Sequence, residues 1–193
     1  MGNLIMWNII TVDGYFEGKK SWDLPWHDLL WSEDLERLSI KQLSSADALL
    51  FGRVTYEGMA KYWRKEVGVI ADYMNSLPKY VTSTTLKTAE WNNSIIIKSN
   101  IKKEVQKLKD TFKKDIYIFG SSMLLQELIN YELVDEFRIG IAPHIHGSGN
   151  LLFKPGLLER NLVVIGVQQV KNNGVIITYK PQKSNTSNEL PKT

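Results

Sequence analysis

Short apolar runs with the composition of β-strands alternate with helical segments along most of this 193-residue chain. The runs are rich in β-branched and aromatic residues and end at Gly, Pro, Asn, Asp or Ser. They cover residues 4–11, 48–51, 79–82, 94–97, 115–119, 137–141, 162–168 and 175–179. Several are apolar without alternation, as in strands covered on both faces. This alternation predicts βαβ units and a mainly parallel sheet with helices on both sides.

Helical patterns occupy the gaps between these runs. Apolar residues at i, i+4, i+7 and i+11 from Ile101 predict a helix that starts near Asn100. A second helix is expected after Ser32, which precedes two acidic residues suited to a helix N-terminus. A third apolar face follows Gly120.

The end of the chain has a different pattern. Asn172-Asn173-Gly174 separates the last two strand-like runs, and Asn-Gly favours a type I′ hairpin turn. The last two strands are therefore expected to be antiparallel. The predicted fold class is α/β, with three α/β/α layers, a mixed and mainly parallel sheet, and a C-terminal antiparallel hairpin.

Composition excludes several classes of protein. Hydrophobic residues make up 43% of the chain, which excludes global disorder. Cysteine is absent, so there is no disulfide framework, thiolate nucleophile, Cys-based zinc site or iron–sulfur cluster. The formal charge is 24 − 21 = +3, which is too small to indicate a nucleic-acid partner.

Residues 1–180 are expected to form one domain. From residue 181 onward the chain is polar, with two prolines and one apolar residue, and we predict a disordered tail over residues 181–193. The N-terminus lacks the pattern of a signal peptide, and no run approaches the roughly 18 apolar residues of a membrane span. The expected location is the cytoplasm, without a membrane partner.

Two strand-to-helix junctions carry residues suited to binding anions. Gly52 ends one strand and is followed by Arg53 and Thr55. Gly120 ends another and is followed by Ser121 and Ser122. Backbone N–H groups at a helix start attract anions, and an arginine binds phosphate with two parallel hydrogen bonds. In open α/β sheets, ligands bind beyond the carboxyl ends of the strands.

Each junction also has an ordinary structural interpretation, in which glycine permits a tight turn and Ser or Thr caps a helix. Neither junction has the Walker pattern or the full G-x-G-x-x-G spacing. Two such junctions on one sheet nevertheless indicate a ligand that carries phosphates.

Seven segments, in order, resemble the dihydrofolate-reductase-like superfamily. Within it, the chain is most similar to stand-alone proteins that match the reductase domain of bifunctional riboflavin-biosynthesis enzymes. The segments are Thr11-Val12-Asp13-Gly14-Tyr15, Leu50-Phe51-Gly52-Arg53-Val54-Thr55-Tyr56-Glu57, residues 78–86, residues 91–94, Ile118-Phe119-Gly120-Ser121-Ser122-Met123-Leu124, residues 133–137 and residues 143–153. The resemblance in element order continues to about Lys180.

The resemblance implies a site for NADPH. Residues that would line the cofactor are Gly52, Arg53 and Thr55. Arg53 and the turn Thr82-Ser83-Thr84 would lie near the adenosine 2′-phosphate. The resemblance also implies that the pyrophosphate is held at a helix N-terminus, by Gly120, Ser121, Ser122, Met123 and Leu124.

The implied activity is NADPH-dependent reduction, with hydride transferred to a small heterocyclic or ribityl-like substrate of the pterin or flavin type. Asp13 is the expected catalytic residue, beside the nicotinamide and the substrate. A carboxylate there can orient a hydroxyl group or, with a raised pKa, donate a proton. Trp22 and Trp26 are the expected substrate-cleft aromatics, although large aromatics also fill cores. A homodimer is expected by the same resemblance.

Dihydrofolate reductase proper carries an acid on the helix after a Pro-Trp segment. Here Pro25-Trp26 is followed by an apolar stretch, and the neighbouring acids Asp28, Glu33 and Asp34 do not match that position. Folate reduction is therefore not predicted. The alternative from another class is a nucleotide-binding module of the same fold without catalytic activity.

Two other patterns have weaker functional interpretations. His144 and His146 have a spacing found in metal sites, but neither a cysteine nor an acid cluster completes a ligand set, so no metal is predicted. Seven lysines between residues 98 and 114 surround an apolar helical stripe without interleaved arginines or aromatics. A solvated helix face explains them, and no nucleic-acid partner is predicted.

Overall fold

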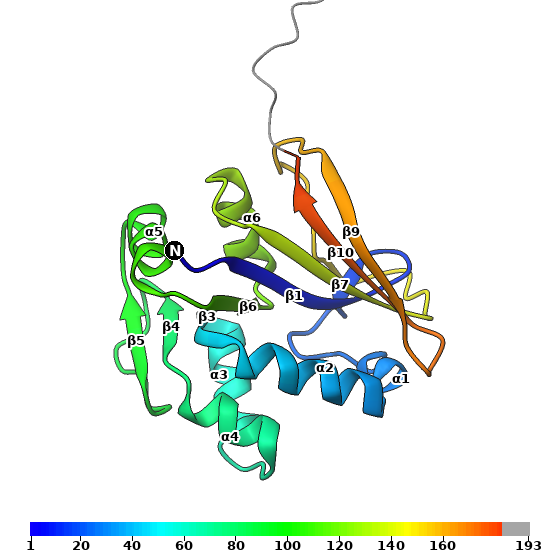
Figure 1. The fold of residues 1–193 in the computed structure, drawn as a ribbon, viewed down its shortest axis with the longest axis horizontal. Helices are drawn as coiled ribbons and strands as arrows, with labels where there is room; N and C mark the ends of the chain where they lie inside the picture. Colours follow the sequence, from blue (N-terminus) through cyan, green and yellow to red (C-terminus); the bar gives the residue numbers. More distant parts are fainter. Residues whose placement is uncertain (183–193) are drawn as a thin grey trace, which may run out of the picture.

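A computed structural model describes residues 1–182 and shows one eight-stranded sheet between two helical layers (Figure 1). The sheet has the order β5-β4-β3-β6-β1-β7-β10-β9. The strands are β1 (Leu4–Thr11), β3 (Ala46–Gly52), β4 (Lys79–Thr82), β5 (Ser94–Ile97), β6 (Asp115–Phe119), β7 (Glu136–Ala142), β9 (Leu162–Gln169) and β10 (Val175–Pro181). The short strands β2 (Tyr15–Glu17) and β8 (Asn150–Leu151) pair separately.

The sheet is mixed, as the sequence predicted. All pairs from β5 to β7 are parallel, so the carboxyl ends of these strands share one edge of the sheet. β10 is antiparallel to both β7 and β9. This topology places the two glycine junctions, at the ends of β3 and β6, on neighbouring strands.

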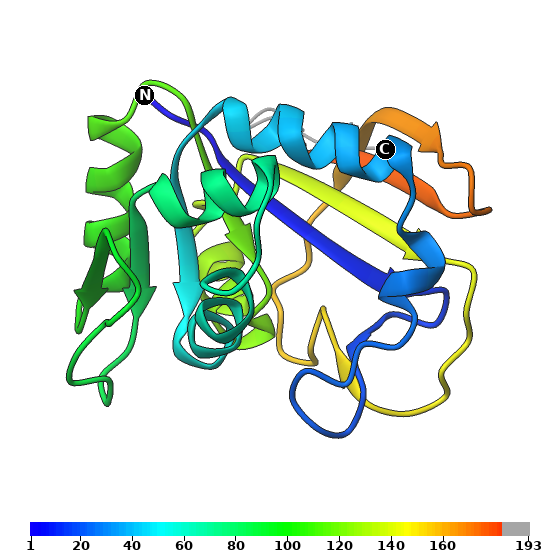
Figure 2. The same cartoon turned by 90° about the horizontal axis from the view of Figure 1, so that it is seen from below.

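Helices cover both faces of the sheet, and the views in Figures 1 and 2 agree on their placement. One layer holds α5 (Ile101–Thr111) and α6 (Ser122–Asn130). The other holds α1 (His27–Leu30), α2 (Glu33–Ser44), α3 (Arg53–Trp63) and α4 (Val69–Ser76). α2 begins where the sequence predicted, because the Ser32 side chain accepts a hydrogen bond from the N–H of Leu35.

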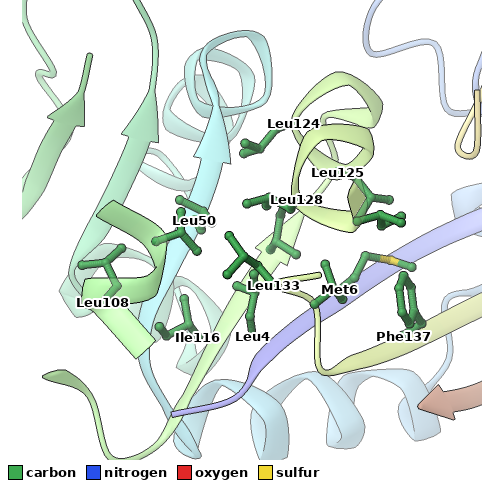
Figure 3. Packing of buried hydrophobic residues seen from close by; sticks show 14 of the residues in the cluster. Leu4, Met6, Leu50, Leu108, Ile116, Leu124, Leu125, Leu128, Leu133 and Phe137 are labelled. Atoms are coloured by element: carbon green, nitrogen blue, oxygen red, sulfur yellow. The ribbon is translucent and has the colours of Figure 1, made fainter. Parts of the chain in front are cut away.

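Each face of the sheet has its own apolar core. Figure 3 shows the core under α5 and α6, where Leu124, Leu125 and Leu128 of α6 belong to the same apolar cluster as Leu4 and Met6 of β1. On the opposite face, Trp7 and Phe51 belong to the core under α1 to α4. Central strands must therefore be apolar on both faces, which explains the runs without alternation.

The structure corrects parts of the sequence prediction. Two helices, α3 and α4, lie where one was expected, and α1, β2 and β8 were not predicted. The final hairpin is antiparallel, but its turn is not type I′, because Asn173 has a φ of 61° while Gly174 is not among the positive-φ residues. The N–H of Val170 bonds to Gly174 O, so three residues form the loop.

The expected domain boundary at Lys180 lies near the end of the last strand. β10 continues to Pro181, and the N–H of Gln182 bonds to Asn161 O at 2.8 Å. The rest of the predicted tail, residues 183–193, lies outside the described residues.

Candidate functional site

A gap in strand pairing opens between β1 and β6 at the carboxyl edge of the sheet. The two strands pair as far as Trp7 and Phe119, after which β6 turns into α6 while β1 continues beside β7. In the gap, the N–H of Gly120 donates to Oδ1 of Asn8 at 2.7 Å. The other amide atom, Nδ2 of Asn8, is buried and has no hydrogen-bond partner within residues 1–182. The gap therefore presents one buried donor that no other group of the described chain uses.

The two glycine junctions interlock beside this gap. A Cβ atom added to Gly52 would lie 2.3 Å from Oγ of Ser121, and one added to Gly120 would lie 3.0 Å from Cγ2 of Thr55. Each glycine therefore makes room for the hydroxyl residue of the other junction. Gly120 also has a φ of +60°, which glycine adopts without strain.

The start of α6 has the geometry of an anion site. Ser121 adopts a left-handed conformation, and its side chain accepts the N–H of Leu124 at 3.4 Å. Ser122 and Met123 follow in the first turn, where backbone N–H groups have no acceptor within the helix. These N–H groups and the helix dipole favour a negatively charged group. The Leu124 side chain is buried in the core, so only its backbone contributes to this junction.

A second polar surface lies at the ends of β3 and β4. Gly52 and Thr82 are paired in register, which places Arg53 beside the turn formed by Thr82, Ser83 and Thr84. The Arg53 guanidinium is half-exposed and contacts Glu57 at 2.9 Å. Thr82 is buried and donates to Phe51 O.

In the turn after β4, some side chains already have hydrogen-bond partners within the chain. The Ser83 side chain accepts the N–H groups of Thr85 and Leu86. Thr84 is exposed. An arginine and an exposed hydroxyl residue thus flank the rim of the sheet, about one strand away from the α6 junction.

A cleft of about 710 Å³ starts at these junctions and runs under α2, α3 and α4. Of the predicted site residues, it is lined by Trp22, Thr55, Gly120, Ser121, Ser122 and Met123. Its aromatic lining includes Trp7, Trp31, Tyr62, Trp63 and Phe119. This size and an apolar lining with a few polar groups are typical of small-molecule sites.

Carboxylates also line the cleft, and of these the sequence analysis considered only Asp28. Glu36, Ser39 and Gln42 of α2 face it at helical spacing, together with Glu17, Asp28 and Glu66. Lys154 is the lysine in the same lining. The i, i+3, i+6 spacing was visible in the sequence. Nothing in the sequence, however, showed which face of α2 lies over the cleft.

His27 also lines the cleft and is held neutral. Burial lowers its pKa to about 4, and the neighbouring Asp28 only partly opposes that shift. Its Nε2 is buried without a partner in the described chain. A neutral imidazole at neutral pH can accept or donate a hydrogen bond but carries no charge.

Asp13 connects two loops and does not line the cleft. Its carboxylate accepts the Thr11 hydroxyl at 2.6 Å and the N–H of Gly147 at 2.7 Å, and it also accepts the N–H of His146. The Thr11 hydroxyl and these backbone groups lower the pKa of Asp13 to about 2. Asp13 is therefore ionised at neutral pH, and its carboxylate ties the Thr11 hydroxyl to the loop at Gly147.

The two predicted cleft tryptophans occupy different environments. Trp22 is 40% exposed, lines the cleft, and its Nε1 donates to Val54 O at 3.3 Å. Trp26 is fully buried and stacks on His144, with ring centroids 5.8 Å apart. Trp26 is thus a core residue outside the cleft lining, which differs from the prediction, whereas Trp22 forms part of the cleft surface.

The structure also shows the surroundings of the clustered lysines and of the His144 and His146 pair. Lys109, one of the seven clustered lysines, is buried against Asp135 at 2.7 Å. His144 and His146 contact each other, and residues 1–182 contain no group of three or more His, Cys, Asp or Glu side chains able to hold a metal. No helix in that part of the chain has the length and apolar character needed to cross a membrane.

Known sequences resemble this chain over most of its length. The sequence model of the RibD C-terminal domain matches residues 3–176. The uncharacterized protein YyaP of Bacillus subtilis (strain 168) is 31% identical over 178 residues, which cover 88% of this chain and 90% of YyaP.

Two solved structures show the same fold. A putative riboflavin biosynthesis protein from Shewanella sp. PV-4 superposes with a TM-score of 0.77 and 20% identity, covering 95% of this chain and all of the other. Dihydrofolate reductase from Enterococcus faecalis, solved in complex with NADP(H), has a TM-score of 0.62 and 18% identity, with 93% and 96% covered.

Proposed function

Because the chain belongs to the RibD C-terminal domain family, we propose that it is an NADPH-dependent reductase that acts on a small heterocyclic substrate. The observation that carries this proposal is the pair of interlocked junctions, Gly52 with Ser121 and Gly120 with Thr55, at the mouth of a cleft of about 710 Å³. Two anion-binding surfaces on adjacent strands of one sheet suit the phosphates of a dinucleotide.

The residues present fit NADPH. At the start of α6, the backbone N–H groups of Ser121, Ser122 and Met123 would hold the pyrophosphate, whereas those of Gly120 and Leu124 donate to Asn8 and Ser121 and shape the junction. Arg53 and the turn at Thr82, Ser83 and Thr84 would bind the adenosine 2′-phosphate, for which a guanidinium is well suited. Asn8, with its unpartnered Nδ2 in the gap beside β6, would contact the end of the cofactor that lies nearest the cleft. The bound cofactor supplies the hydride, and the protein supplies position and electrostatics.

The substrate would occupy the cleft next to that gap. Trp22 would cover it from the loop before α1. Asp13 would act as a fixed carboxylate that orients the Thr11 hydroxyl and holds the loop at His146 in place. Reduction also requires a proton, and the carboxyl groups of Asp28 and Glu36 line the cleft where a donor is needed.

A nucleotide-binding module without turnover is the second candidate. The ionised state of Asp13 favours it, because a carboxyl group with a pKa of about 2 does not donate a proton at neutral pH. The two candidates share the cofactor site and differ in chemistry alone.

Titration with NADPH and, separately, with NADH tests the cofactor site that both candidate functions share. We expect NADPH to quench tryptophan fluorescence at much lower concentration than NADH, because Trp22 lines the cleft and Arg53 would bind the 2′-phosphate. Absence of binding by either cofactor would overturn the proposal. Turnover of NADPH with a panel of oxidised pterins, flavins and pyrimidines then separates a reductase from a binding module.

A further inference from the structure

One side-chain amide in the lining of the cleft is buried and has neither of its polar atoms hydrogen-bonded within the described residues. Gln42 of α2 is 3% exposed, and both its Oε1 and its Nε2 lack a hydrogen-bond partner among residues 1–182. The lining from α2 and α4 includes the apolar residues Leu43, Ala71 and Met74, and Ser39 precedes Gln42 by one turn on the same helix face. An unsatisfied buried amide destabilises a fold, so its presence requires an explanation.

Resting on the reductase function proposed above, we propose that Gln42 binds the amide edge of a planar heterocyclic substrate. A ring that carries adjacent N–H and C=O groups offers one donor and one acceptor, which match the acceptor and donor of the glutamine side chain. The aromatic and methionine side chains of the same cleft suit the faces of such a ring. Gln42 would then determine which rings enter, because a ring without that edge leaves its amide unpaired.

Gln42 borders a smaller recess of about 410 Å³ as well, which lies between α2 and strands β9 and β10. The larger cleft is the better site for a ring, because it joins the gap at Asn8 where the cofactor is proposed to lie. Gln168 lines the smaller recess and not the larger cleft. It therefore provides a matched control for a substitution at Gln42.

The test compares Gln42→Met with Gln168→Met. The probes are lumazine, a flat bicycle with amide edges, and quinoxaline, a flat bicycle without one, and binding is observed by ligand-detected NMR. We expect wild type and Gln168→Met to bind lumazine in preference to quinoxaline. Gln42→Met should lose at least tenfold in lumazine affinity while its melting temperature stays equal or rises, because an unpaired buried amide has been removed.

Three outcomes would overturn the proposal: a lower melting temperature or failure to fold in Gln42→Met, loss of lumazine binding in Gln168→Met, or no lumazine binding by wild type. NADPH titration of the same samples keeps the two proposals separate. If lumazine binds as expected and NADPH does not bind, the proposed cofactor is refuted and the proposed Gln42 site stands. Normal NADPH binding in all samples, without selective loss of lumazine in Gln42→Met, would refute the Gln42 site alone.

Discussion

The indole ring of Trp22 lies directly over Gly58 in the middle of α3. A Cβ atom added to Gly58 would lie 1.8 Å from Cε2 of Trp22, and the Trp22 Nε1 donates to Val54 O one turn earlier. Trp22 itself adopts a φ of 69°, which is uncommon for a bulky residue. The loop before α1 is thus held against α3 by one aromatic contact that only glycine allows.

The Gly58→Ala substitution therefore tests whether the Trp22 indole rests on α3, because alanine favours the helix but collides with the indole. Alanine stabilises a helix interior by about 0.5–1 kcal/mol relative to glycine. Here that gain is offset because the indole must leave its site. In a Trp22→Ala background the same substitution should yield the full gain, measured by urea unfolding. An equal gain in both backgrounds would show that Trp22 does not rest on Gly58 in solution.

Arg53→Ala should weaken NADPH binding and leave NADH binding unchanged. The guanidinium is proposed to bind the 2′-phosphate, which NADH lacks, and a loss of about tenfold corresponds to about 1.4 kcal/mol. Isothermal titration calorimetry with both cofactors measures the difference. Arg37→Ala is the control, because Arg37 is also exposed on a helix and paired with nearby acids. Equal weakening for NADPH and NADH would contradict the assigned role.

Glu57→Gln should strengthen NADPH binding by a small factor. Glu57 contacts the Arg53 guanidinium at 2.9 Å and competes with a phosphate for it. Removal of that carboxylate should leave the arginine free for the cofactor. The same calorimetric titration at low and high salt checks this, because the gain should shrink as salt screens the charges.

Asp13→Asn should reduce the acid sensitivity of the fold. The pKa of Asp13 is lowered to about 2 in the folded chain, from an ordinary value near 3.8. Its stabilising contribution is therefore complete above pH 3.8 and is lost as pH falls towards 2. Urea midpoints at pH 5 and pH 2.5 should differ less in the variant than in wild type. NADPH affinity should be unchanged, whereas any turnover should fall.

His27→Gln should reduce the pH dependence of the free energy of unfolding between pH 6.5 and pH 4. Burial lowers the pKa of His27 to about 4, so the unfolded chain binds more protons between pH 6.5 and pH 4. Stability is therefore full above pH 6.5 and decreases as pH falls towards 4, by an amount on the order of 3 kcal/mol for this residue. Unfolding curves at pH 7 and pH 4.5 measure the difference. An identical decrease in wild type and variant would rule out a buried neutral imidazole.

Much of the fold could be predicted because the signals are local. The strands Lys79–Thr82, Ser94–Ile97 and Asp115–Phe119 lie where the apolar runs predicted them, since each run is bounded by residues that break strands. The glycine junctions were also visible, because a strand that stops at glycine before a hydroxyl residue is a local pattern. The split into α3 and α4 was missed, since it depends on a turn near Gly68, which has a φ of 110°.

The sequence alone determined the α/β class and the strand-to-helix junctions, because backbone preference and hydrophobic period are properties of neighbouring residues. The tertiary structure decided the environments of distant groups. It buried Trp26 while leaving Trp22 on the cleft, gave Asp13 three hydrogen-bond donors that keep it ionised, and turned Glu36 and Gln42 of α2 towards the cleft. Burial and electrostatics depend on what the rest of the chain places around a side chain, and this determines which residues of the site carry charge and which amide remains available to a ligand.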